Sequence, residues 1–172
     1  QAKRIHDRIA GVPPSEAVLN SMENLIATGD PGDAIDAAYL AMDNKNFYNV
    51  TLVNLITPWT NEAQSVFQED MDDEGTLNDY NATVIGAIRD DIDFRRILYD
   101  DILYVGAGTL GISGYSYSNN NHYQQLEELG VDLGDSSVLV GPVSQAANTG
   151  GVLTNVDTAG VITTRAAAKA FF

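Results

Sequence analysis

Cysteine is absent from all 172 residues of the sequence. Disulfide bonds, thiolate metal sites and cysteine nucleophiles are therefore excluded within this chain, because each of them requires a sulfhydryl group. The same absence excludes covalent attachment of a c-type haem, whose attachment motif is C-x-x-C-H. Histidine is almost as scarce: only His6 and His122 are available for imidazole chemistry.

Basic side chains are also few, with 9 lysines and arginines against 24 aspartates and glutamates and a formal net charge of -15. Such a surface repels nucleic-acid phosphates and anionic lipids, and it attracts cations or basic partners. Binding to DNA, RNA or a membrane surface is therefore disfavoured. The alternative is that the acidity only keeps the protein soluble in a salty or extracellular setting.

Long hydrophobic runs are missing as well. No stretch approaches the roughly 18 apolar residues that a membrane-spanning helix needs, and the amino end does not show the pattern of a signal peptide. We therefore expect no membrane span. The composition, 44% hydrophobic and 19% charged, is typical of a folded globular protein.

The first half of the sequence contains a series of amphipathic helix patterns. Ser15 is placed to cap a helix whose apolar residues recur every three or four positions until Gly29. Asp30 and Pro31 then predict another N-cap with proline at the first helical position. Residues 47–56 predict a further helix, or a strand because of their β-branched content.

The second half is richer in glycine, serine and asparagine. Asn78 or Asp79 can cap a helix, and Asp93 can cap another. Residues 102–105 are a candidate strand or a buried helix end, and residues 138–140 are a candidate strand. We predict a mainly α fold: an irregular multi-helix domain with long Gly/Ser/Asn-rich loops in its second half and at most a small strand pair.

The length favours a single domain over residues 1–172, since domains of roughly 100–200 residues are usual. The sequence ends in RAAAKAFF, which predicts a short helix capped by Thr163 or Thr164. Such a helix would leave Phe171 and Phe172 exposed to water. We therefore expect the domain to be a portion of a larger protein.

An acidic stretch in the middle of the chain matches part of a calcium-loop pattern. It supplies oxygens at positions one, three and five, glycine at six and a backbone oxygen at seven. The predicted ligands are Asp70, Asp72, Glu74, Thr76, Asn78 and Asn81. Position five is Glu, and the Asn at position twelve cannot supply the usual bidentate carboxylate. The alternative is a solvated acidic loop that favours the N-terminus of the following helix.

A second acidic cluster consists of Asp90, Asp91, Asp93, Asp100 and Asp101. Two of these carboxylates can in principle act as an acid/base pair, as in glycosidases, but the spacing singles out no pair. We favour a solvated helix face whose partners are Arg89, Arg95 and Arg96.

His122 lies in a polar segment rich in asparagine and tyrosine. It can serve as a distal ligand to a haem iron that another segment or chain holds. The alternative is an ordinary surface histidine, because polar side chains are mostly exposed.

Three segments carry a family resemblance. They are RIAGVPPSEAVLNSM at residues 8–22, VIGAIRDDIDFRRILYDDILYVG at 84–106 and AGVITTRAAAKAFF at 159–172. Together they resemble the helical domains of planctomycete-type bacterial cytochrome c-associated proteins. In that family R-x-x-G-x-x-P-[ST], D-x-x-F-x-x-L-L-x-x-D-[YI] and a later G-[VIL]-[LM]-T helix precede a c-type haem motif.

This chain ends before any C-x-x-C-H. The resemblance therefore implies an exported, helix-rich scaffold that packs beside an electron-transfer module, and it transfers no catalytic residue. We expect a non-catalytic structural or interaction domain of a periplasmic or extracellular bacterial protein. Its partner would be the remainder of the parent polypeptide, a second protein chain or another copy of itself. The alternatives are a calcium-stabilised extracellular binding or assembly module and, third, a hydrolase that uses paired acids.

Overall fold

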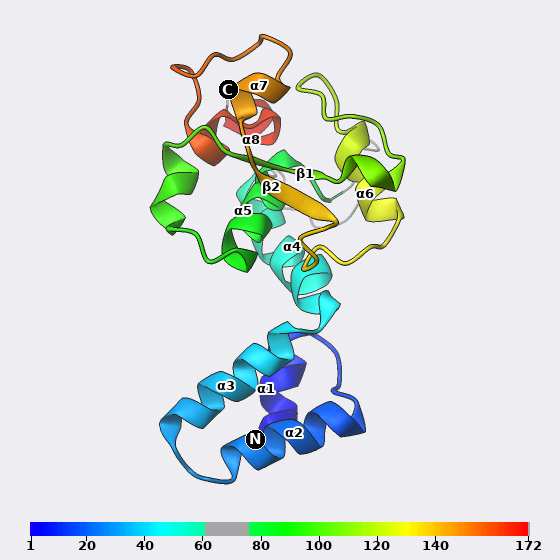
Figure 1. Cartoon of the computed structure of the whole chain (residues 1–172), viewed down its shortest axis with the longest axis vertical. Coiled ribbons are helices and arrows are strands. Elements are labelled where there is room, and N and C mark those ends of the chain that lie inside the picture. The colour runs from blue at the N-terminus through cyan, green and yellow to red at the C-terminus, as the bar shows by residue number, and fades with distance from the viewer. Residues whose placement is uncertain (61–75, 172) are drawn as a thin grey trace. The chain divides into compact units, whose positions relative to one another are not determined.

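The computed structural model describes residues 1–60 and 76–171. The described chain is mainly helical and contains one two-stranded sheet (Figure 1), so the predicted mainly α class with a small strand pair is confirmed. The chain divides into two compact units, Gln1–Leu52 and Val53–Phe172, and each is described by itself. The single domain expected over residues 1–172 stays a prediction.

Unit 1 is built from three helices that pack against one another: α1 (Ala2–Ile9), α2 (Glu16–Ile26) and α3 (Pro31–Met42). Their shared core is small, because alanine supplies most of its fully buried side chains. Half-buried isoleucine, leucine and valine side chains of the three helices surround this core. The buried core residues are Ala2, Met22, Ala37 and Ala41.

The helix starts of unit 1 follow the sequence signals. Ser15 Oγ accepts a hydrogen bond from the Val18 N–H at 3.3 Å. Asp30 Oδ1 accepts from the Gly32 N–H at 2.8 Å, and proline takes the first position of α3. Both N-caps are therefore confirmed, and each satisfies a backbone donor that the first helical turn leaves unpaired.

The segment predicted as a helix or strand over residues 47–56 is helical. It consists of η1 (Phe47–Leu52), a π-helix in unit 1, and α4 (Val53–Ile56) in unit 2. A 3-10 turn, η2 (Thr57–Trp59), follows and contains Pro58. The strand alternative is wrong, although the β-branched residues were compatible with it.

The centre of unit 2 is α5 (Asp79–Arg89), which begins at the predicted cap: Asn78 Oδ1 accepts from the Asn81 N–H at 3.0 Å. Most residues of α5 are buried. The neighbours of α5 include the sheet, η4 (Phe94–Leu98), η6 (Gly160–Thr163) and α8 (Arg165–Phe171).

The sheet pairs β1 (Leu103–Gly106) with β2 (Leu139–Val143) in antiparallel fashion. Leu103 lies opposite Val143 and Gly106 opposite Leu139, with an irregularity between them. Helix α6 (Asn121–Glu128) packs on β1, and η5 (Gly108–Leu110) follows that strand. Both strands lie where the sequence places them, within one to three residues at each end.

Candidate functional site

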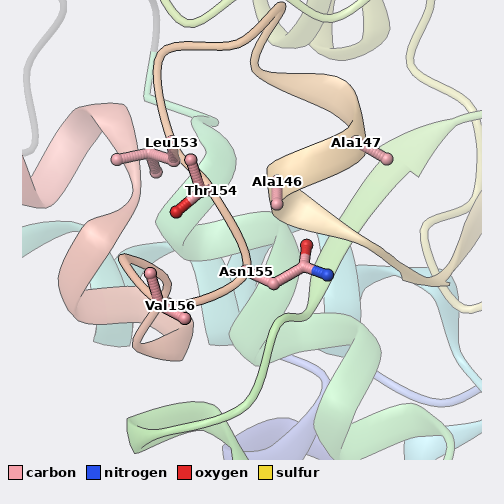
Figure 2. Close-up of a pocket in the computed structure, with 6 residues that line it drawn as sticks. All are labelled: Ala146, Ala147, Leu153, Thr154, Asn155 and Val156. Atoms are coloured by element: carbon pink, nitrogen blue, oxygen red, sulfur yellow. The ribbon is translucent and has the colours of Figure 1, made fainter.

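A surface hollow of about 450 Å³ lies beside α7 (Gln145–Asn148) in unit 2. Two alanines of α7 form part of its lining, and the loop that follows α7 supplies the rest (Figure 2). The lining combines small and aliphatic side chains with one hydroxyl and one amide. The lining residues are Ala146, Ala147, Leu153, Thr154, Asn155 and Val156.

The local sequence explains how this hollow forms. Ser144 caps α7 by accepting the Ala147 N–H at 3.0 Å. Gly150 and Gly151 then adopt φ values of 64° and 88°, which favour glycine, and turn the chain. Thr149 Oγ1 accepts from the Leu153 N–H at 3.1 Å and closes the turn. The loop is thereby held beside α7.

Two carboxylates accept hydrogen bonds from residues that line the hollow. Asp101 Oδ1 accepts from the Ala146 N–H at 2.8 Å. Asp157 Oδ2 accepts from the Thr154 N–H at 3.0 Å and from its hydroxyl at 2.5 Å. These hydrogen bonds from Thr154 lower the pKa of Asp157. Neither aspartate belongs to any of the ion pairs within the described chain.

Large apolar side chains are exposed on the neighbouring elements η4 and η6, which contact each other. The Gly160 N–H of η6 donates at 2.8 Å to the carbonyl of Asp100, which lies two residues after η4. Gly160 has a φ of 51°, and a Cβ there would lie 1.9 Å from the Ile97 carbonyl oxygen. We call the exposed set the η4–η6 surface; it comprises Phe94, Leu98, Tyr99 and Ile162, which are 48%, 52%, 62% and 45% exposed.

The second acidic cluster is largely paired with arginine, as predicted. Arg95 contacts Asp93 at 2.5 Å, and Arg96 contacts Asp100 at 2.6 Å. Arg89 contacts Asp90 at 2.7 Å. Because the cations come from neighbouring positions, three of the five carboxylates form local ion pairs; those of Arg95 and Arg96 lie at the surface, whereas the Arg89 side chain is buried.

Asp90 makes a further contact with the buried sheet. Its Oδ2 accepts from the Tyr104 hydroxyl at 2.8 Å. Burial alone would raise the pKa of Asp90, but the hydrogen bonds from Arg89 and Tyr104 lower it. The Arg89 guanidinium also lies 5.7 Å from the centre of the Tyr104 ring and donates to the Leu139 carbonyl at 2.6 Å. These contacts join α5 to both strands.

His122 is buried, with 3% of its surface exposed, so the surface alternative is wrong. Its Nε2 accepts from the Gly106 N–H at 2.8 Å, and its Nδ1 lies 2.6 Å from the Ser113 carbonyl oxygen. This pairing requires a neutral ring whose proton is on Nδ1. Burial lowers the pKa of His122. Coordination of iron through Nε2 would replace the bond to Gly106, and the haem-ligand role stays a prediction.

Asp79 is the polar centre of unit 2, and sequence reasoning considered it only as a helix cap. It is 1% exposed, yet its two oxygens accept from four donors. These are the N–H groups of Tyr80, Arg165 and Ala166 and the hydroxyl of Tyr115. Burial raises the pKa of Asp79, and the donors oppose that effect. The carboxylate thus caps α8 from a distant part of the sequence.

Three of the predicted calcium ligands, Asp70, Asp72 and Glu74, lie outside the described residues. The other three are described and are engaged within the protein. Asn78 caps α5, and Asn81 Nδ2 donates to the Thr76 carbonyl at 2.8 Å. The Thr76 hydroxyl donates to Glu127 of α6. Asn81 Oδ1 is buried and has no hydrogen-bond partner among the described residues. Calcium binding stays a prediction.

Two further properties concern only residues 1–60 and 76–171. Within these ranges no group of three or more histidine, cysteine, aspartate or glutamate side chains is placed to hold a metal ion. None of the helices found there is long and apolar enough to cross a membrane.

Sequence reasoning missed the hollow beside α7 and the η4–η6 surface. The η4–η6 surface brings together segments that are far apart in sequence, as the hydrogen bond between Gly160 and Asp100 shows. The hollow is lined by residues 146–156 alone, but the Asp101 carboxylate that accepts from the Ala146 N–H lies 45 residues earlier in the chain. The paired glycines at 150 and 151 predict a turn, but they do not predict what the turn packs against.

Comparisons of the chain with models of known protein families, with curated proteins and with solved structures found no match. The resemblance to cytochrome-associated proteins therefore rests on the three sequence segments alone.

Proposed function

We propose that this chain is a non-catalytic interaction domain of an exported bacterial protein of the c-type cytochrome kind. Its partner is the remainder of its own polypeptide or a second protein chain. In this proposal the η4–η6 surface is the principal contact. The chain itself serves as a scaffold beside an electron-transfer module that another segment or chain carries.

The observation that carries the proposal is the η4–η6 surface. Four large apolar side chains there are between 45% and 62% exposed, and they lie in or directly after two elements that contact each other. Apolar side chains exposed on adjoining elements are candidates for a protein interaction site, because their burial against a partner is favourable. Its rim bears the ion-paired residues Arg95 and Asp93, which suits the polar edge of an interface.

The hydrogen bonds made by the polar side chains of unit 2 also support a scaffold role. Asp79, Asp90 and His122 each have a shifted pKa: burial raises that of Asp79 and lowers that of His122, and hydrogen bonds lower that of Asp90. Groups with shifted pKa values are candidates for catalysis. Here each is bonded to backbone or side-chain partners that join α5, α6, α8 and the sheet. These bonds hold the secondary-structure elements together.

The three segments that resemble cytochrome-associated proteins suggest the kind of parent protein and its location outside the cytoplasm. Because the chain lacks cysteine, any covalent haem would be attached to the partner. The acidic charge of -15 fits a partner whose facing surface is basic.

The test uses the full product of the gene that encodes this chain. Its visible spectrum is recorded, and amide hydrogen exchange over residues 94–99 and 160–163 is compared with that of the isolated 172-residue chain. We expect haem absorbance and slower exchange of these amides in the full product. A colourless product in which the same amides exchange at equal rates, and to which no haem-carrying protein binds, contradicts the proposal.

A further inference from the structure

We propose that the hollow beside α7 binds an arginine or lysine side chain that a partner protein presents. This inference rests on the proposed interaction role and specifies the chemistry of the partner. The hollow would then be a second, charge-selective contact in addition to the apolar η4–η6 surface.

The lining of the hollow suits the stem of such a side chain. Leu153 and Val156 offer aliphatic surface, and Ala146 and Ala147 leave space because their side chains are short (Figure 2). Val156 is 92% exposed, so its side chain contributes little to the stability of the isolated chain. Lysine and arginine bury three or four methylene groups along apolar surface while their charged ends stay at its edge.

The charge beside the hollow suits the cationic end. Asp157 is bonded to Thr154 of the lining, and Asp101, which precedes β1, is bonded to Ala146 of the lining, so a carboxylate lies beside each of the two segments that form the hollow. Neither carboxylate has a cationic partner within the described residues. A guanidinium or ammonium group would supply the charge that is missing there.

The net negative charge of unit 2 as a whole also favours a cationic partner. Unit 2 contains 5 lysines and arginines and 17 aspartates and glutamates, which gives a formal charge of -12 for the unit. A field of this sign raises the rate at which cationic partners arrive and disfavours acidic ones.

Asn155 provides a polar group of the right kind. Its side-chain amide makes no hydrogen bond to the rest of the described chain, and Figure 2 shows it at the hollow beside Ala146. An amide oxygen accepts from a guanidinium or ammonium, and the amide nitrogen can donate to a carbonyl of the partner backbone. An uncharged apolar side chain would leave this amide without a hydrogen-bond partner and both carboxylates without a counter-charge.

The experiment titrates N-acetyl-arginine amide into the ¹⁵N-labelled chain and follows amide chemical shifts. N-acetyl-citrulline amide serves as the matched probe, because it keeps the shape and loses the charge. We expect saturable shifts at residues 146–147 and 153–157, with a Kd on the order of millimolar, and about tenfold weaker binding of the citrulline probe. Equal binding of the two probes, or no shifts in the hollow, overturns the inference.

Asp157→Asn tests the charge, because asparagine can still accept the bonds from Thr154. We expect this variant to weaken binding of the arginine probe about fivefold. Asp135→Asn is the control, since Ser137 bonds Asp135 in the same way through its backbone N–H and hydroxyl, both at 2.7 Å. If both variants bind as the parent chain does, the inference is wrong.

The two proposals can fail separately. If the arginine probe does not bind while η4 and η6 are protected in the full gene product, only the charge-selective contact is wrong. If the probe binds at the hollow while η4 and η6 remain unprotected, the principal contact of the proposed function is wrong instead.

Discussion

The carboxylate of Asp79 accepts a hydrogen bond of 2.6 Å from the backbone N–H of Arg165, 86 residues further along the chain. The Ala166 N–H donates to the other oxygen at 3.0 Å. Because Asp79 begins α5 and Arg165 begins α8, one side chain joins the N-terminal turns of two helices. Tyr115 adds a third donor from the loop between β1 and α6. This carboxylate therefore ties together three parts of unit 2 that are distant in sequence.

Asp79→Ala should destabilise unit 2 by at least about 2 kcal/mol, because each buried donor that loses its acceptor costs about 1–3 kcal/mol. Denaturant unfolding measures the change. The amide hydrogen-exchange rates of Arg165 and Ala166 should also increase more than those of the other amides in unit 2. Glu128→Gln, on the exposed face of α6, is the control and should change stability by less than about 0.5 kcal/mol. Equal stability of Asp79→Ala and the parent chain would show that the network is not structural.

Gly86 and Tyr104 test how closely α5 packs on the sheet. A Cβ at position 86 would lie 2.1 Å from Cδ1 of the Tyr104 ring. Although alanine normally favours a helix over glycine by about 1 kcal/mol, we expect Gly86→Ala to destabilise the protein by about 1–3 kcal/mol through overpacking. Thermal or denaturant unfolding provides the measurement.

The control is Gly114→Ala, where an added Cβ meets no atom within 4 Å and φ is not in the left-handed region. It should be neutral or stabilise by up to about 1 kcal/mol, since alanine restricts the unfolded chain. A Gly86→Ala protein as stable as this control would contradict the close packing of Tyr104 on α5.

His122 should make unit 2 sensitive to acid. Burial lowers the pKa of His122 in the folded state below the value of about 6.5 in the unfolded chain. Between these two pKa values the unfolded state binds more protons, so the stabilising contribution is present above about pH 6.5 and declines as the pH falls through the folded-state pKa. The melting temperature should therefore decrease below about pH 6.5.

His122→Gln isolates this effect, because glutamine does not titrate. Its stability should be lower than that of the parent chain at pH 7.5, and the difference should shrink towards pH 5. Asp79 acts in the opposite direction, since burial raises its pKa and favours the protonated carboxyl in the folded state. The comparison between the two proteins removes that common contribution. A stability difference that is constant with pH would contradict a neutral, hydrogen-bonded His122.

Local features of the fold were predictable from sequence, and tertiary ones were not. The caps at Ser15, Asp30 and Asn78 were identified correctly, because each satisfies backbone donors within three residues of itself. The role of Asp79 was missed, because its partners at Arg165 and Ala166 come from another helix. The spacing of residues in the sequence does not predict a hydrogen bond between two helices that are so far apart along the chain.

His122 shows the same limit at the level of a single site. A polar neighbourhood in sequence predicted an exposed side chain, whereas the ring is buried between β1 and the loop that follows it. The helix predicted to follow its cap at Asp93 is a short 3-10 element, η4, in which Phe94 and Leu98 are exposed. Short 3-10 elements present such residues to solvent more readily than a long amphipathic helix does.

The most direct test of the interaction role is the affinity of the chain for its haem-carrying partner polypeptide, measured by isothermal titration calorimetry. The double substitution Leu98→Ser and Ile162→Ser removes apolar area from the η4–η6 surface. Leu129→Ser is the control, because Leu129 is also 50% exposed but follows α6. We expect the double variant to bind about tenfold to a hundredfold more weakly and the control to bind as the parent chain does. Equal affinities of all three proteins, or no binding by the parent chain, would contradict the account.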